Sequence, residues 1–154
     1  MELYLVQHAE SKTKEEDPER GLTDSGFANV RKTAGFVKKL DISVETIYYS
    51  DKLRAKQTAN GLAEGINSVT GLKQRDGIAP MDDISSMKDE IQGSDKNLMV
   101  VGHLPYMAKL ASALLCGNEN QNVVSFQNSC IIKLVRDEEN KEWSVKWMIT
   151  PDIC

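Results

Sequence analysis

The chain has 154 residues, of which 40% are hydrophobic and 27% are charged, and this balance excludes extended disorder. Its formal net charge of −4 does not favour nucleic acid or an anionic membrane as a partner, so an anionic ligand needs a local group of Arg and Lys side chains. No apolar run approaches the roughly 20 residues of a membrane-spanning helix, and the length predicts one domain over residues 1–154.

The cysteines and the first residues indicate the cellular compartment of the protein. Cys116, Cys130 and Cys154 are odd in number, widely spaced and without a CxxC pair, which predicts free thiols in a reducing environment. The first residues lack the basic and apolar regions of a secretory signal. We therefore expect a cytoplasmic protein.

Strand and helix patterns alternate along the chain. The expected elements are, in order, a strand over 2–7, a helix over 24–39, a strand over 44–49, a helix over 51–64, a strand over 68–75, a helix over 82–92, a strand over 97–101, a helix over 105–117, and strands over 125–136 and 143–148. Thr23 or Asp24 can cap the first helix, and Ser50 or Asp51 the second. This order predicts a three-layer α/β/α sandwich with a mostly parallel central sheet and a C-terminal antiparallel hairpin.

The two histidines of the chain each end a buried-strand pattern. His8 follows the apolar run before it, and His103 follows residues 98–102. Because ligands of open α/β sheets bind at the carboxyl ends of the strands, we expect both imidazoles at one pocket. Arg54 lies near the start of the second helix, and Arg20 ends the loop after the first strand.

Two imidazoles and two guanidiniums suit a small phosphate dianion. A neutral imidazole can attack phosphorus and form a phosphohistidine that water hydrolyses, provided that its other ring nitrogen donates its proton to a fixed acceptor. The second imidazole and the arginines stabilise the charge on the equatorial oxygens. This chemistry needs no metal and no cofactor.

Four segments resemble, in the right order, signature elements of the histidine phosphatase superfamily (the phosphoglycerate mutase-like, branch-one fold): residues 5–10 (LVQHAE), 20–26 (RGLTDSG), 50–59 (SDKLRAKQTA) and 100–105 (VVGHLP). The resemblance covers nearly the whole chain. The small size and the His-Leu-Pro tripeptide look most like the SixA-type phosphohistidine phosphatases. The resemblance implies that His8 is the nucleophile, that His103 is the second phosphate-binding imidazole, and that Arg54 and Arg20 bind phosphate.

One position departs from the family pattern. Gln7 stands where the family has arginine, so a phosphate ligand there contributes hydrogen bonds without charge. This substitution predicts weakened turnover unless another cation compensates, and the candidates are Lys12, Lys52 and Lys56. Larger family members use a glutamate as general acid, whereas the corresponding stretch here offers only aspartates, Asp82 and Asp83, which are also candidate helix caps.

The preferred function is a metal-independent phosphatase acting on phosphohistidine, carried by a protein or a small phosphoramidate, because an imidazole leaving group is protonated more readily than an alkoxide. Two alternatives remain open at this point. The first is a catalytically impaired domain that binds phosphate or a phosphoprotein. The second is a phosphatase for small phosphomonoesters.

Overall fold

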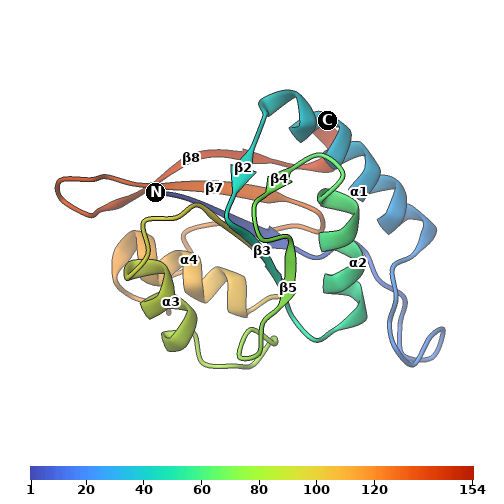
Figure 1. Ribbon diagram of the computed structural model, residues 1–154. Helices are drawn as coiled ribbons and strands as arrows, with labels where there is room; N and C mark the ends of the chain where they lie inside the picture. Colours follow the sequence, from blue (N-terminus) through green and yellow to red (C-terminus); the bar gives the residue numbers. More distant parts are fainter.

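The computed structural model describes all residues, 1–154, and contains a mixed six-stranded sheet between two layers of helices (Figure 1). The strand order is β5-β3-β6-β1-β7-β8. The strands of this sheet are β1 (Glu2–Gln7), β3 (Thr46–Tyr49), β5 (Leu72–Gln74), β6 (Leu98–Gly102), β7 (Ile131–Arg136) and β8 (Trp143–Ile149). The first four run parallel, and β7 is antiparallel to both β1 and β8. The predicted mostly parallel sheet with a C-terminal hairpin is confirmed.

Four α-helices cover the two faces of the sheet. They are α1 (Asp24–Val37), α2 (Leu53–Leu62), α3 (Ser85–Gln92) and α4 (Tyr106–Cys116), and two 3₁₀ turns lie at Lys38–Leu40 and Pro151–Ile153. Figure 1 shows α1 and α2 on one face and α3 and α4 on the other. None of the helices has the length and apolar character that crossing a bilayer requires.

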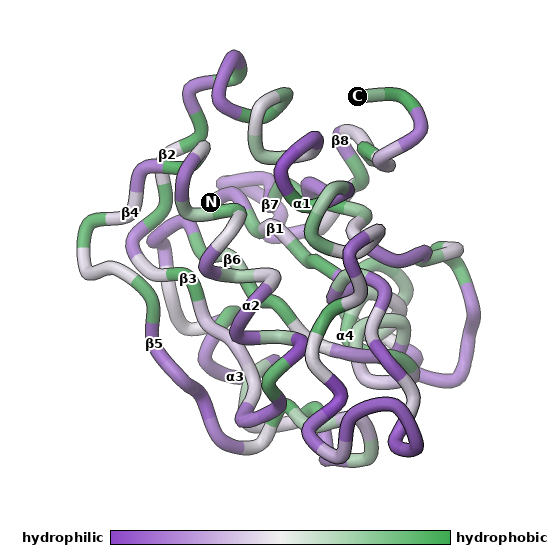
Figure 2. Tube along the Cα trace, turned by 90° about the vertical axis from the view of Figure 1, so that its right-hand side faces the viewer, coloured by the Kyte–Doolittle hydropathy of each residue, from purple (hydrophilic) through white to green (hydrophobic).

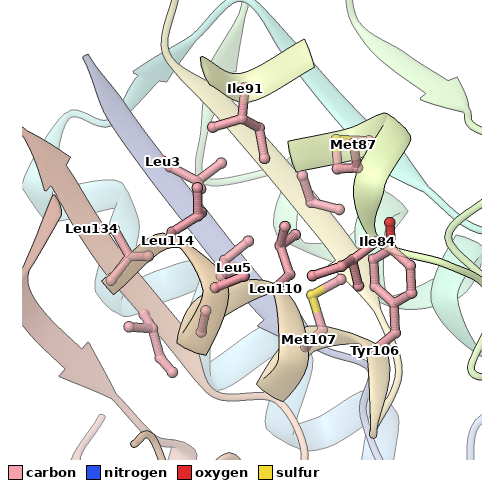
Figure 3. Packing of buried hydrophobic residues seen from close by; sticks show 14 of the residues in the cluster. Leu3, Leu5, Ile84, Met87, Ile91, Tyr106, Met107, Leu110, Leu114 and Leu134 are labelled. Carbon is pink, nitrogen blue, oxygen red and sulfur yellow. The ribbon is translucent and has the colours of Figure 1, made fainter. Parts of the chain in front are cut away.

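Alternate residues of β1 contribute to two separate cores. Leu3 and Leu5 pack with α3 and α4, in the cluster that Figure 3 shows from close by. Tyr4 and Val6 pack with α1 and α2 on the opposite face. A strand buried on both faces needs a continuous apolar sequence, which explains why the pattern of residues 2–7 is so clear. In Figure 2 the central strands are mainly green and the peripheral loops mainly purple, in agreement with this burial.

The elements differ from the expected ones at several boundaries. The predicted strand over 44–49 divides into β2 (Ser43–Val44), which pairs with β4 (Asn67–Ser68), and β3, which joins the main sheet. Of the predicted strand over 125–136, only β7 pairs with its neighbours. Thr23 caps α1 as expected, since its hydroxyl accepts from the Gly26 amide.

The expected cap of α2 was wrong. Its N-cap residue is Lys52, whose own side chain forms no capping bond, while the Ser50 hydroxyl accepts from the Lys52 amide at 3.3 Å. Ser50 is buried, and its hydroxyl also bonds to a histidine ring. Ser50 directly follows β3, which lies next to β6, so its hydroxyl contacts both the residue before α2 and the residue after β6.

Candidate active site

Strand pairing brings the two histidines together. In the register of the parallel strands β1 and β6, Gln7 pairs with Gly102, so the next residues of the two strands, His8 and His103, emerge side by side. Their ring centroids lie 5.0 Å apart, with the planes inclined by 56°. The expectation that both imidazoles lie at one edge of the sheet agrees with this geometry.

A backbone carbonyl fixes the tautomer of His8. Its Nδ1 lies 2.7 Å from the carbonyl oxygen of Ala9. Because a carbonyl only accepts, Nδ1 carries the proton and donates it, which leaves a lone pair on Nε2. Burial lowers the pKa of His8 to about 4; the fields of Arg54 and Arg20 also lower it, against the Ala9 carbonyl, which raises it. His8 is therefore neutral at pH 7 and suited to nucleophilic attack through Nε2.

Arg54 lies directly against this lone pair. Its Nε donates to His8 Nε2 at 3.3 Å. Thr58, one turn further along α2, ties the helix to the loop after β1: its hydroxyl accepts from the Ala9 amide at 3.0 Å and donates to the Arg54 carbonyl at 2.7 Å. The Thr58 hydroxyl thus holds the start of α2 and the His8 loop in a fixed relation.

Arg20 supplies a second guanidinium near the same place. Its backbone has φ of +53°, and its side chain folds back so that Nε donates to the Lys12 carbonyl at 3.2 Å. Burial and the field of Arg20 lower the pKa of Arg54. The five ion pairs of the protein include neither Arg20 nor Arg54. Two unneutralised guanidiniums beside a neutral imidazole favour an anionic ligand.

The Gln7 side chain is hydrogen-bonded to another side chain of the protein. It is buried, and its Nε2 donates to Asn128 Oδ1 at 2.8 Å. Its Oε1 has no hydrogen-bond partner within the protein. The loop that contains Asn128 is also bonded to the end of β1, because the Ser129 amide donates to the Gln7 carbonyl at 3.1 Å. The expected phosphate ligand is thus held at the rim of the site by a neutral amide pair.

The three lysines proposed as substitutes for the missing arginine have different surroundings. Lys52 forms an ion pair of 3.0 Å with Asp51. The field of Lys12 acts on carboxylates of its own loop. Lys56 is exposed and lines a cavity together with Arg54. None of these three lysines is in hydrogen-bond contact with His8 or His103.

The two aspartates considered as general acids both bond to backbone amides of their own loop. Asp82 accepts from the Ala79 amide, and Asp83 from the Ser85 amide, each at 2.8 Å. Neither aspartate is the N-cap of α3, because that position is held by Ile84 and has no side-chain capping bond. The structure contains no group of three or more His, Cys, Asp or Glu side chains that could hold a metal ion.

Comparison with known proteins decides the family. Residues 3–82, which include His8, Arg20 and Arg54, match the family model of the histidine phosphatase superfamily (branch 1). The chain belongs to this superfamily. The matched residues form more than half of the chain, and His103 lies beyond them, directly after β6.

Relatives of this chain include SixA-type proteins. The phosphohistidine phosphatase SixA of Escherichia coli is 24% identical over 98% of this chain and 94% of its own length. A structure of the protein histidine phosphatase SixA complexed with tungstate has a TM-score of 0.84 at 22% identity and covers 99% of both chains. An alpha-ribazole-5′-P phosphatase of Escherichia coli also has this fold, with a TM-score of 0.75 at 12% identity over 98% of both chains.

Ser50 is a contact of this site that the sequence predicted only as a candidate helix cap. Its Oγ lies 2.5 Å from His103 Nε2, and both residues are only 1% exposed. The other ring nitrogen of His103, Nδ1, has no partner within the protein. Burial lowers the pKa of His103 to about 3, and the fields of His8 and Arg54 act in the same direction. A hydroxyl both donates and accepts, so Ser50 can hold the ring in its neutral and its protonated form.

We expect Ser50→Ala to lower kcat by roughly 10–100-fold, because the His103 ring loses the bond that orients it. The KM for substrate is expected to change less, since the guanidiniums remain. Steady-state kinetics measure both parameters. Ser50→Thr keeps the hydroxyl and is expected to retain more activity than Ser50→Ala. A matched control is Ser112→Ala, which removes another buried serine hydroxyl that bonds to the Gln121 carbonyl. Equal losses in Ser50→Ala and Ser112→Ala would contradict a positioning role.

Proposed function

We propose that this protein is a metal-independent phosphatase that hydrolyses phosphohistidine through a phosphohistidine intermediate on His8. The fixed tautomer of His8 carries the proposal. Its Nδ1 donates its proton to the Ala9 carbonyl, and its Nε2 lone pair faces the guanidinium of Arg54, which has no ion-pair partner. The centroid of the His8 ring lies 5.0 Å from that of the second imidazole, His103. This combination suits nucleophilic attack on an anionic phosphoryl group.

The reaction proceeds in two displacements. In the first, the His8 Nε2 lone pair forms a bond to phosphorus while the bond between phosphorus and the substrate nitrogen breaks. The departing imidazole keeps that electron pair and is protonated from water. In the second, a water oxygen attacks the phosphorus of phospho-His8, the bond to Nε2 breaks, and Nε2 recovers its lone pair. Water supplies a hydroxide to the phosphate and a proton to solvent.

The remaining site residues bind the phosphoryl oxygens in this proposal. Arg54 and Arg20 supply the positive charge, and His103 donates through Nδ1, the ring nitrogen that Ser50 leaves unengaged. Gln7 contributes a neutral carboxamide, whose interaction with a charged oxygen is worth about 1.5–3 kcal/mol. With one charge fewer than the family pattern, turnover is expected to be slow.

The carboxylates near the site are all engaged in other bonds, which favours a substrate whose nitrogen–phosphorus bond is cleaved. Asp82 and Asp83 are bound to backbone amides. Asp51, whose field reaches His103, is paired with Lys52. An alkoxide leaving group needs a positioned acid, which typically contributes 10²–10⁴-fold to rate. A departing imidazole is basic enough to take its proton from solvent, so this site favours phosphohistidine over a sugar phosphate.

Two SixA proteins support this proposal. The Escherichia coli relative is a phosphohistidine phosphatase, and the SixA structure holds tungstate, a tetrahedral oxyanion like phosphate. A phosphatase named for alpha-ribazole-5′-phosphate has the same fold, so the fold by itself does not select the substrate. We further propose that residues 1–154 form one domain and that it acts in the cytoplasm, where its three free cysteines would stay reduced.

Substrate preference tests the proposal. We expect kcat/KM for a phosphohistidine peptide to exceed that for a phosphoserine peptide of otherwise identical sequence by about 10²-fold or more, the usual value of a general acid for an alkoxide leaving group. Phosphate release from the two peptides at pH 7 measures the ratio. Faster release from phosphoserine would contradict the proposal and support a small phosphomonoester phosphatase.

One observation supports a second candidate function. The neutral Gln7–Asn128 amide pair stands where the family pattern has a guanidinium, and a site with this change can bind phosphate while turning it over poorly. A phosphate-binding or phosphoprotein-binding domain is the alternative that follows. It predicts stabilisation by phosphate without measurable hydrolysis of either peptide.

A further inference from the structure

A cationic cavity lies beside the candidate active site. Its volume is about 580 Å³, and its lining includes five basic side chains. These are Lys14, Arg20, Lys52, Arg54 and Lys56. Arg20 and Arg54 also belong to the phosphoryl site, whereas neither histidine lines the cavity. The two arginines therefore join the cavity to the site of chemistry.

Most of the positive charge in this cavity is unpaired. Its acidic lining residues are Glu19 and Asp51, and Asp51 is already paired with Lys52. Lys14 and Lys56 take part in none of the ion pairs of the protein. The cavity thus gathers a net positive charge in a chain whose net charge is −4. Such a local field attracts an anion against the charge of the whole molecule.

The lining indicates which kind of anion fits. Leu53 and Pro18 are the apolar side chains of the cavity, and no aromatic ring lines it. A nucleoside or a sugar ring normally packs on such surfaces, so the lining does not favour either. The volume of about 580 Å³ is far larger than the roughly 10–15 Å³ that one water molecule requires on the same measure. It therefore exceeds what a single phosphate group needs and leaves room for several flexible acidic side chains.

We propose that this cavity is a second anion site, which binds carboxylates flanking the phosphorylated side chain of a protein substrate. The proposal rests on the function proposed above and specifies its substrate class: an acidic phosphoprotein segment. The planar forks of Arg20 and Arg54 suit the phosphoryl group, and the point charges of Lys14 and Lys56, on flexible stems, suit separate carboxylates. A substrate of this kind spans both sites through the shared arginines.

Binding of non-hydrolysable peptides tests the site without turnover. The probes are two peptides that carry phosphoryltriazolylalanine, a phosphohistidine mimic, flanked by either Asp or Asn residues. Calorimetry is expected to show about tenfold tighter binding of the Asp peptide at low salt and a smaller difference at high salt. The double variant Lys14→Glu/Lys56→Glu is expected to lose this preference for the Asp peptide.

The double variant Lys39→Glu/Lys146→Glu is the matched control, since both lysines are exposed and lie outside the cavity lining. It changes the net charge equally and is expected to keep the preference. Equal binding of the two peptides to the wild type, or equal losses in both double variants, would overturn the proposal. So would tripolyphosphate binding that depends on Lys14 and Lys56 without any preference for the Asp peptide. Failure of phosphohistidine hydrolysis alongside an intact preference would overturn only the proposed reaction.

Discussion

Replacement of His8 by alanine is expected to abolish phosphohistidine hydrolysis and to leave no phosphoryl group on the protein. The expected loss in kcat is on the order of 10⁶-fold, the cost seen when a catalytic nucleophile is removed from a hydrolase site that acts as a unit. His8 has the only ring nitrogen at the site that is both unprotonated and in contact with an unneutralised guanidinium. Brief incubation with a radiolabelled phosphohistidine peptide, followed by an alkaline quench, measures label retained on the protein.

His103→Asn is the matched comparison for this experiment. It removes the second imidazole and leaves the nucleophile and its Ala9 contact in place. We expect it to acquire label slowly, whereas His8→Ala acquires none. Phosphate-dependent thermal unfolding checks that both variants remain folded. Label or full turnover in His8→Ala would show that another group attacks phosphorus.

The sequence predicted those parts of the site that follow from strand ends. The buried runs before His8 and His103 are continuous because β1 and β6 are covered on both faces, and such runs are readily recognised. Parallel pairing then places the next residues at the same edge of the sheet. Arg54 was predictable for a similar reason, since it lies in the first turn of the helix that follows β3.

The contacts between side chains from different strands and loops could not be predicted in the same way. The bond from Ser50 to His103 depends on the register between β3 and β6, in which Tyr49 pairs with Val101. The Gln7 amide bonds to Asn128, which lies 121 residues further along the chain. Neither pairing has a local pattern, because a side-chain hydrogen bond between distant segments leaves no periodicity in the sequence.

Substitution of Gln7 by arginine is expected to raise kcat by about 10²–10³-fold, the usual value of one preorganised donor to the developing charge. The Gln7 side chain is 9% exposed and has an unpartnered Oε1, so it already occupies a desolvated position at the rim of the site. A guanidinium is longer and carries five donors, which allows it to bond to Asn128 and to reach a phosphoryl oxygen. Steady-state hydrolysis of a phosphohistidine peptide measures the gain.

The effect of Gln7→Arg on thermal stability provides a second, independent measurement. A buried guanidinium at this position gains no carboxylate partner, since Gln7 bonds to the neutral Asn128 amide, so Gln7→Arg is expected to lower the Tm of the free protein, and phosphate is expected to restore it. Gln7→Leu, which has similar size and no donor, is the control and is expected to lower kcat without this phosphate dependence.

The activity of the wild type then separates the two proposed functions. A wild type that turns over slowly and gains from Gln7→Arg is an enzyme that lacks one positive charge at its transition state. If the wild type binds phosphate without hydrolysis and only the Gln7→Arg variant is active, the protein is a binding domain whose site lacks one group needed for catalysis. No gain in Gln7→Arg would mean that the existing cations already neutralise the phosphoryl group, and the account of Gln7 as the limiting residue would be wrong.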